Sequence, residues 1–242
     1  MTQRAHGWDR LSPDETTIEP VEIWLDGEPT WWSRHPRRNP GEVRRHERAA
    51  RWRDITVVCI TSPLWLPLLL IVASLVKLQD RSAPVFFRQM RTGRDGRRIG
   101  VLKFRTMIKD AETQKQSLMH LNELVWPDFK ITNDPRITTI GKFLRGTSLD
   151  ELPQLLNVLK GDMALVGPRP TSFGVETYDS WHTARLELRP GLSGLWQVAA
   201  RGDLEWDERV RLELAYADRA STRLDLAILI RTVGAVLKGS GQ

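Results

Sequence analysis

Residues 55–78 read ITVVCITSPLWLPLLLIVASLVKL, the one long apolar run in this 242-residue chain. The run carries no charge before Lys77, and about 20 apolar residues are enough for a helix to cross the hydrocarbon core of a bilayer. A long polar segment precedes it, which is unlike the short N-terminal region of a cleaved signal peptide. We therefore expect residues 55–78 to enter a membrane.

Two features of this run favour a bend within it. Ser62-Pro63 and Pro67 lie inside the run, and each proline removes a backbone donor and presses on the preceding helical turn. Basic residues flank both ends, and positively charged flanks prefer the cytoplasm. A helix that enters the membrane, breaks and returns would satisfy both features, with Ser62 bonding a freed backbone group. A kinked transmembrane helix is the alternative, and the residues alone leave both open.

The rest of the chain divides around this run. Residues 1–42 are polar and without hydrophobic periodicity, which predicts a flexible tail. Residues 43–80 combine a basic juxtamembrane stretch with the membrane segment, and residues 81–242 form the body. The body is predicted to be α+β, mainly helical with a small β-hairpin. Its predicted strands cover 85–89 and 99–104, with a turn at Gly93 and Asp95-Gly96, and its predicted helices cover 107–124, 141–147, 150–160, 206–220 and 224–238.

Composition narrows the classes of partner. The formal net charge is +6 and the pI is about 9.8, which favours phosphorylated substrates, acidic lipids or nucleic acid without choosing among them. Cys59 is the only cysteine, so no intrachain disulfide can form and a zinc site is not expected. The chain contains neither a GxxxxGK[ST] loop nor a GxGxxG fingerprint, which leaves P-loop and dinucleotide-binding interpretations unsupported.

The densest set of chemically useful residues is LRGTSLDELPQLLNVLKGDMALVGPRP, residues 144–170. Asp150 and Glu151 are adjacent carboxylates at a predicted helix start, where the helix dipole favours a negative charge and hence a carboxylate nucleophile. The alternative is a structural cap. Ser148 with Glu151 spells a capping box, whereas Pro153 fits better if Asp150 itself lies near the N-cap. Two carboxylates without neighbouring His or Cys suit Mg²⁺, with Mn²⁺ as a second choice.

Several basic residues lie in the same stretches of sequence as Asp150 and Glu151 or in neighbouring motifs, next to turn-forming Gly and Pro. This arrangement is typical of loops that bind phosphate. Pro168-Arg169-Pro170 is a stiff loop that would hold Arg169 at low entropic cost. The basic residues in this set are Lys103, Arg105, Arg136, Arg145, Arg169 and Arg201.

Three stretches resemble the bacterial sugar transferases, also called monotopic phosphoglycosyl transferases. They are PVFFRQMRTGRDGRRIGVLKFRTM (84–107), DPRITTIGKFLRGTSLDELPQLLNVLKGDMALVGPRP (134–170) and RPGLSGLWQVAARGD (189–203). The resemblance runs from about Arg53 to Gly239, with motifs in matching order and spacing. It implies a re-entrant membrane helix broken at Ser62-Pro63, with the catalytic domain on the cytoplasmic face of the bacterial inner membrane.

The resemblance also implies a reaction. Asp150 would attack the β-phosphorus of a UDP-sugar and release UMP, and polyprenyl phosphate would then take the phosphosugar from the enzyme. Glu151 would be the magnesium ligand, and Arg169 between Pro168 and Pro170 would bind the nucleotide. Lys103, Arg145 and Arg201 fall at positions associated with phosphate handling. The product, a polyprenyl diphosphate sugar, would begin assembly of an exopolysaccharide, capsule, O-antigen or glycoprotein glycan.

Some positions depart from the family pattern. Ala200 stands where the family often has Gly before the arginine, so the match at Arg201 is less direct than at the other site residues. Thr222-Arg223 stand where apolar residues are common in the family, which argues against membrane contact of that stretch. The segment 195–198 resembles hexose-type members, favouring glucose or galactose over N-acetylated sugars. Membrane lipid is an expected partner and nucleic acid is not, and a homodimer stays open.

Two other functions compete with this one. A membrane-anchored basic module for nucleic acid or acidic lipid would explain the charge but not the Asp150–Glu151 pair, and the chain has no aromatic-basic RNA motif. A membrane-bound phosphohydrolase would use Asp150 and Mg²⁺ but no lipid acceptor.

Overall fold

The structure, a computed structural model, describes residues 38–123, 129, 131–199 and 204–237. The predicted tail 1–42 therefore lies outside the described residues except for its last five positions, and Arg201 lies outside them as well. The segment before the apolar run is helical from Pro40 onward.

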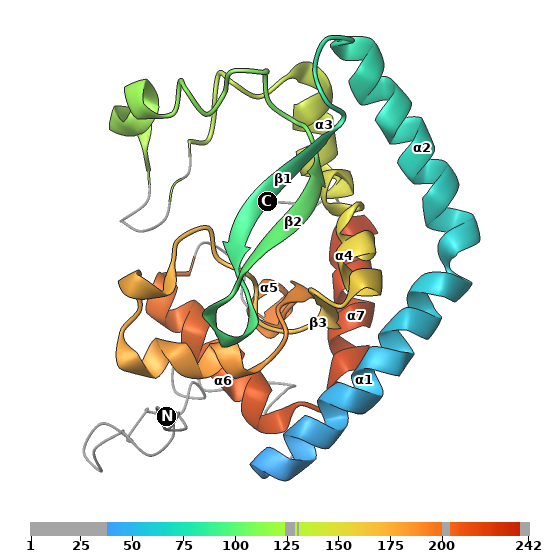
Figure 1. Ribbon diagram of the computed structural model, residues 1–242, viewed down its shortest axis with the longest axis vertical. Helices are drawn as coiled ribbons and strands as arrows, with labels where there is room; N and C mark the ends of the chain where they lie inside the picture. The colour runs from blue at the N-terminus through green and yellow to red at the C-terminus, as the bar shows by residue number, and fades with distance from the viewer. Residues whose placement is uncertain (1–37, 124–128, 130, 200–203, 238–242) are drawn as a thin grey trace, which may run out of the picture.

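Two consecutive helices, α1 (Pro40–Ile60) and α2 (Ser62–Gln79), form one side of the molecule and meet at an angle (Figure 1). Helix α1 begins with a capping box, in which the Asn39 side chain accepts from the Glu42 amide at 3.0 Å and Glu42 accepts from the Asn39 amide at 3.1 Å. This cap fixes where the long helix starts.

The break between α1 and α2 lies at Thr61, one residue before the predicted Ser62-Pro63 break. The Ser62 hydroxyl donates to the Cys59 carbonyl at 2.7 Å, so it satisfies a backbone group at the break as the sequence analysis expects. Pro63 lies in the first turn of α2, where a missing N–H is tolerated. Pro67 lies inside α2, which continues through it. The helix break is therefore present, whereas its re-entrant placement in a membrane stays a prediction.

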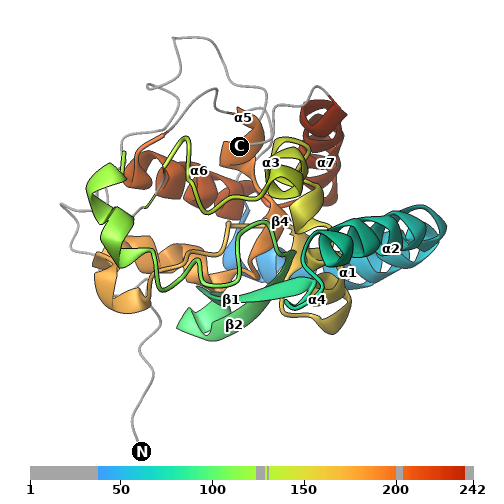
Figure 2. The same cartoon turned by 90° about the horizontal axis from the view of Figure 1, so that it is seen from above.

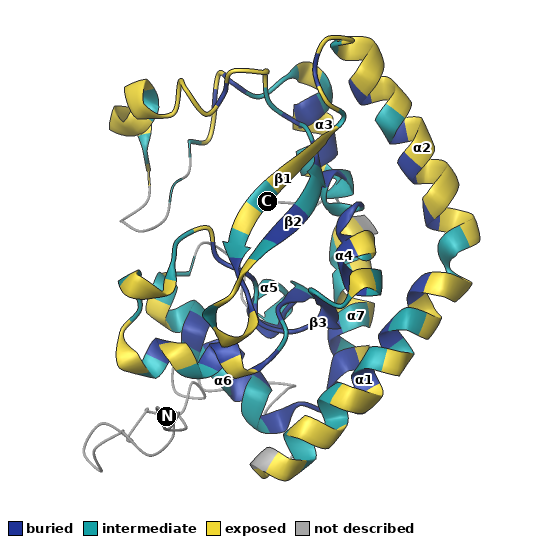
Figure 3. Ribbon diagram, viewed as in Figure 1, coloured by how far each residue is buried: buried dark blue, intermediate teal, exposed yellow. Residues whose placement is uncertain are grey.

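Helix α2 is long and apolar enough to cross a membrane. One face packs against the protein through Trp65, Leu69, Val72 and Val76, and the Trp65 indole N–H donates to the Val58 carbonyl of α1 at 2.9 Å. The remaining faces expose leucine and isoleucine side chains, and most of the helix is coloured as exposed in Figure 3. Such a continuous apolar surface marks a contact with lipid or protein.

The predicted β-hairpin is confirmed. Strand β1 (Phe86–Thr92) pairs antiparallel with β2 (Arg98–Phe104), with Phe86 opposite Phe104. The turn contains a short 3-10 segment, Arg94–Gly96, in which Asp95 and Gly96 have φ of 54° and 73°. Gly and Asp tolerate this left-handed backbone better than most residues, which explains the turn.

The predicted helix over 107–124 is wrong. In the described part of this span, residues 109–115 form turns and Gln116–Leu121 form a short 3-10 helix, η4. The Ile108 amide donates to the Arg136 carbonyl at 3.0 Å, and the Arg136 guanidinium donates to the Ala111 carbonyl at 3.0 Å. Pairing with the segment around Arg136 therefore replaces the helical hydrogen bonds that the sequence pattern favours.

The other predicted helices are present. They are α3 (Thr139–Gly146), α4 (Gln154–Lys160), α6 (Trp206–Arg219) and α7 (Thr222–Leu237). A short parallel pair, β3 (Ala164–Val166) with β4 (Gly191–Ser193), was not expected. The remaining elements are helix α5 (Leu195–Ala199) and the 3-10 segments η5 (Leu149–Glu151), η6 (Val175–Thr177) and η7 (Ser180–Glu187). The body is thus mainly helical α+β, as predicted, and its described residues form two small sheets instead of one.

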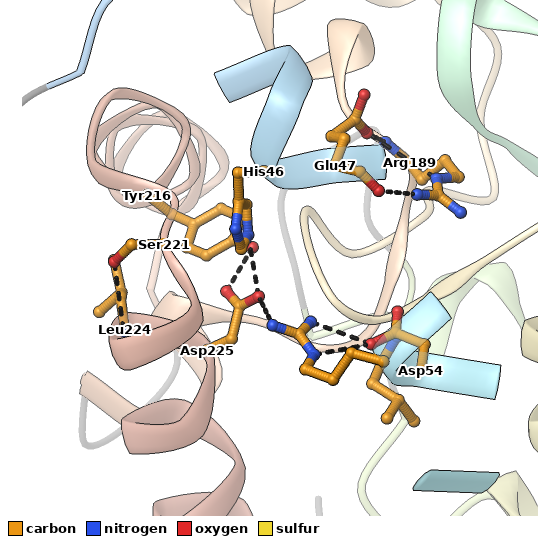
Figure 4. A network of polar contacts seen from close by, with 10 residues as sticks. His46, Glu47, Asp54, Arg189, Tyr216, Ser221, Leu224 and Asp225 are labelled. Carbon is orange, nitrogen blue, oxygen red and sulfur yellow. Dashed lines mark hydrogen bonds and ion pairs between the residues drawn. The ribbon is translucent and has the colours of Figure 1, made fainter. Parts of the chain in front are cut away.

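A buried set of polar side chains joins α1 to the body (Figure 4). Asp225 of α7 pairs with Arg53 at 2.7 Å and with His46 at 3.0 Å, and it accepts from the Tyr216 hydroxyl at 2.8 Å. Asp54 pairs with Arg53 at 2.9 Å and accepts from the Leu165 amide of β3 at 3.1 Å. We call His46, Arg53, Asp54, Tyr216 and Asp225 the anchor network, because their contacts link α1 to α7 and β3 and link α6 to α7.

Candidate active site

Asp150 and Glu151 lie in η5, a single 3-10 turn between α3 and α4. Neither predicted cap register is correct: the Ser148 side chain makes no capping bond, and α4 starts only at Gln154 with Pro153 at its N-cap. Pro153 has no N–H to donate to the Leu149 carbonyl, and the Leu152 amide bonds that carbonyl instead at 3.2 Å. Both carboxylates therefore precede the helix, and its dipole is not their main stabilising influence.

Glu151 is neutralised by two cations. Its carboxylate accepts from the Lys103 ammonium at 2.6 Å and from the Arg169 guanidinium at 2.7 Å. Burial would raise the pKa of Glu151, but the charges and hydrogen bonds of Arg169 and Lys103 outweigh it and hold that pKa far below its ordinary value. Glu151 is therefore ionised and joins β2 to the Pro168–Pro170 loop.

Asp150 has the opposite character. It is only 7% exposed, its nearest cation is Lys103 at 3.8 Å, and its carboxylate makes no hydrogen bond to the described part of the chain. Burial raises the pKa of Asp150 above its ordinary value, and Lys103 offsets part of that increase. Asp150 is thus a desolvated carboxylate whose oxygens accept no hydrogen bond from the described residues, an arrangement that a carboxylate nucleophile would require.

Arg145 is a second cation that interacts electrostatically with Asp150. Its Nε donates to the Thr106 hydroxyl at 2.9 Å, and its terminal guanidinium nitrogens make no hydrogen bond to the described residues. Burial lowers the pKa of Arg145, and the charge of Asp150 opposes that effect. A partly desolvated guanidinium with free donors is suited to bind phosphate.

These side chains line one open cavity of about 1020 Å³. Of the sequence-predicted site residues, the structure brings together Lys103, Arg105, Arg145, Asp150, Glu151, Arg169 and Pro170. Pro168 is buried behind the wall, where its carbonyl accepts from the Gly191 amide at 2.9 Å. Arg136, another of the basic residues, is also on the wall but is paired with Asp134 at 2.6 Å. Aromatic side chains, including Phe173, Trp196 and Trp206, complete the lining.

Three residues that the sequence pattern does not single out, Glu213, Arg185 and Arg91, hold the Pro168–Pro170 loop. The Arg169 amide donates to Glu213 of α6 at 2.7 Å, and the buried Arg185 donates both to the Arg169 carbonyl and to the other oxygen of Glu213. At the end of the loop, Arg91 of β1 donates to the Pro170 carbonyl at 2.7 Å. The sequence spacing could have indicated that Glu213 is buried, because it lies three residues from both Val210 and Tyr216 and therefore shares their face of α6.

Comparison with known proteins identifies the family. The family model described as "Bacterial sugar transferase" matches residues 45–239. The chain belongs to the bacterial sugar transferases. The resemblance seen in the sequence is thereby confirmed over most of the chain.

Several bacterial sugar transferases of known name are similar to this chain. "Galactosyl transferase CpsE" of Streptococcus agalactiae is 44% identical over 167 residues, which are 68% of this chain and 37% of that protein. "Exopolysaccharide production protein ExoY" of Rhizobium meliloti is 38% identical over 80% of this chain and 88% of its own length. "UDP-glucose:undecaprenyl-phosphate glucose-1-phosphate transferase" of Caulobacter vibrioides is 40% identical over 76% of this chain and 68% of its own length. The chain thus spans less than half of CpsE but most of ExoY.

The donor set of this sugar transferase fits a magnesium ion only in part. The described residues contain no group of three His, Cys, Asp or Glu side chains that could hold a metal. Two adjacent carboxylates at a cavity wall suit Mg²⁺ when the remaining ligands are water and substrate phosphate. Lys103 and Arg169 occupy the Glu151 carboxylate, so a metal at Glu151 would share or replace their contacts.

Proposed function

We propose that this chain is a phosphoglycosyl transferase that moves a sugar-1-phosphate from a UDP-sugar to polyprenyl phosphate at a bacterial membrane. The family assignment supports this, since the Caulobacter relative is named for transfer of glucose-1-phosphate to undecaprenyl phosphate. Such a product would begin the assembly of a polysaccharide, and the Rhizobium relative is named for exopolysaccharide production.

The observation that carries the proposal is the contrast within one dipeptide. Glu151 accepts hydrogen bonds from Lys103 and Arg169, while the neighbouring Asp150 lines the cavity and carries no hydrogen bond to the residues that the structure describes. A structural cap would use its carboxylate oxygens on backbone amides. Asp150 does not, which favours the catalytic interpretation of the pair over the structural one.

In the first step, an Asp150 oxygen would attack the β-phosphorus of the UDP-sugar. A new P–O bond to Asp150 would form while the P–O bond to UMP breaks, and UMP would leave with the bonding electrons. Arg145 beside Asp150 can bind the phosphoryl oxygens, and Arg169 on its rigid loop can bind the nucleotide diphosphate. Asp150 must be ionised for this step.

In the second step, an oxygen of dianionic polyprenyl phosphate would attack the phosphorus held on Asp150. The P–O bond to Asp150 would break and return the carboxylate, leaving a polyprenyl diphosphate sugar. Dividing the transfer in this way lets one site use a water-soluble donor and a lipid acceptor in turn.

A divalent cation, Mg²⁺ or Mn²⁺, would neutralise charge on the donor diphosphate when bound. Glu151 and oxygens of the substrate would bind this cation. Lys103 would then pair with the substrate phosphate and no longer with Glu151. Asp150 would keep its role as nucleophile.

The α1–α2 pair would place this site at the cytoplasmic face of the inner membrane. The break at Thr61 and the exposed apolar surface of α2 support a hairpin that enters and returns. The donor sugar is proposed to be glucose or galactose, since one relative is named for each.

The test is release of UMP by the full chain in nanodiscs with Mg²⁺, undecaprenyl phosphate and a panel of UDP-sugars. We expect multiple turnovers with a hexose donor only when the lipid acceptor is present, together with a labelled phosphosugar on the protein when it is absent. Repeated turnover without lipid would support a phosphohydrolase instead. No release from any donor would contradict both enzymatic functions.

A further inference from the structure

A second, smaller cavity lies at the C-terminal end of α2. It measures about 180 Å³ and is lined by Val76, Gln79, Asp80, Arg105, Ile108 and Lys109, among others. Arg105, Ile108 and Lys109 also line the large cavity that contains Asp150. The segment 105–109 therefore forms the boundary between the end of the apolar helix and the candidate active site.

Arg105 is the buried charge at this boundary. Its side chain is 10% exposed, and its Nη1 pairs with Asp80 at 3.3 Å, while the Asp80 side chain is 36% exposed. The other Asp80 oxygen accepts from the Ser82 amide and hydroxyl at 2.9 and 2.7 Å. Ion pairs with an exposed carboxylate are weak. A ligand phosphate could therefore replace Asp80 as the partner of Arg105, whereas Lys103 and Arg169 are held more closely by Glu151.

The surroundings of Arg105 suit an amphiphile. Leu78, one residue before the end of α2, is 64% exposed, and Ile108 on the cavity wall is 39% exposed. A long hydrocarbon chain could follow the exposed surface of α2 and end at Arg105 and Lys109, where its phosphate would find two positive charges. Soluble UDP-sugar has no need of this apolar approach.

We propose that Arg105 binds the phosphate of the polyprenyl acceptor, and that the end of α2 guides the lipid chain to it. The inference rests on the proposed function and names the acceptor subsite within it. The backbone continues directly from Arg105 to Thr106, whose hydroxyl holds Arg145 beside Asp150. An acceptor phosphate bound at Arg105 would thus lie next in sequence to the residue that positions Arg145 in the cavity wall.

The experiment separates the two half-reactions. In nanodiscs with undecaprenyl phosphate, Arg105→Ala should raise the KM for the acceptor at least tenfold and leave the KM for the UDP-sugar within twofold. The amount of phosphosugar formed on the protein without acceptor should match the wild type, which also shows that the variant is folded. Arg97→Ala is the matched control, because it removes the same charge from an exposed turn outside both cavities.

Asp80→Asn tests whether Arg105 acts only by pairing with Asp80. If Arg105 binds acceptor, removing its competitor should leave the acceptor KM unchanged or lower it. A rise equal to that of Arg105→Ala would overturn the proposal, since the ion pair itself would then be what matters. Equal loss of the donor half-reaction in Arg105→Ala would overturn it too. Failure of the wild type to form the phosphosugar would instead contradict the proposed function.

Discussion

The anchor network and the active-site cluster are both groups of partly buried charges, but they are organised differently. In the anchor network, Asp225 contacts Arg53, His46 and Tyr216, and Arg53 has a second partner in Asp54 (Figure 4). In the active-site cluster, Glu151 takes the close contacts, and Asp150 and the terminal nitrogens of Arg145 carry no hydrogen bond to the described residues.

On the proposed function, the difference separates charges that stabilise the fold from charges that take part in the reaction. A buried ion pair contributes to stability only when its partners stay matched, and removing one leaves an uncompensated charge. A site that binds phosphate must leave some of its charged groups without a partner until substrate binds. These unpaired charges lower the stability of the folded protein. In Figure 1, helix α1, which carries His46, Arg53 and Asp54 of the anchor network, lies to the right of the β1–β2 hairpin, which carries Lys103, and Figure 2 shows the same elements from above.

The sharpest test of this comparison is Asp150→Asn. It should lower turnover by at least about 10³-fold, because an amide cannot serve as the nucleophile, and phosphosugar labelling of the protein should disappear. Its thermal unfolding midpoint should equal or exceed that of the wild type, because a desolvated carboxylate is removed. Asp162→Asn, which changes a carboxylate paired with the exposed Lys160, should leave activity unchanged. Activity retained in Asp150→Asn would contradict the catalytic assignment.

Asp225→Ala should show the converse pattern. Loss of the central carboxylate of the anchor network should cost about 3–5 kcal/mol in the free energy of unfolding, because Arg53 and His46 lose a buried partner. The folded fraction of Asp225→Ala should still form the phosphosugar on Asp150. Denaturant unfolding of both Asp225→Ala and Asp162→Ala would check this, with a cost below about 1 kcal/mol expected for the latter. Equal effects of the two substitutions would remove the basis of the comparison.

The rate at which the phosphosugar forms on the protein should depend on pH through the ionisation of Asp150. Burial raises the pKa of Asp150, and only its ionised form attacks phosphorus, so the rate should rise with pH through a value above 3.8. The stability effect has the opposite sign. A raised carboxyl pKa favours the folded state below the ordinary pKa, and this contribution is lost as pH rises through the folded value. Single-turnover rates and unfolding of wild type and Asp150→Asn from pH 4 to 8 would measure both. A pH-independent difference in stability would contradict the raised pKa.

The smallest expected effect concerns the backbone next to the site. Ser148 has φ of 57°, a left-handed conformation that a non-glycine residue adopts at a cost. Ser148→Gly should relieve this strain but add entropy to the unfolded chain, for a net stabilisation of about 0.5 kcal/mol. Thermal unfolding is the measurement, and Ser172→Gly, on an exposed position of the cavity wall, is the comparison. Destabilisation by Ser148→Gly would show that the side chain has another role.

Local patterns were enough to predict much of the fold. The β-hairpin, helices α3, α6 and α7, and a helix break near Ser62-Pro63 follow from alternation, 3.6-residue periodicity and proline chemistry. The helix predicted over 107–124 failed because its backbone groups bond to the segment around Arg136, more than 20 residues away in sequence. The β3–β4 pair was missed for the same reason, since parallel pairing joins distant segments.

The sequence by itself determined the family, the position of the apolar helices and the residue types at the active site, because these depend on local order and spacing. Tertiary structure decided which charges are matched. In the folded chain, Glu151 pairs with Lys103 and Arg169, whereas Asp150 faces the cavity. Arg105 pairs with Asp80, and Arg185 and Glu213 hold the loop that contains Arg169. The physical reason is that charge pairing depends on distance and burial, and the chain brings these residues together only after it folds.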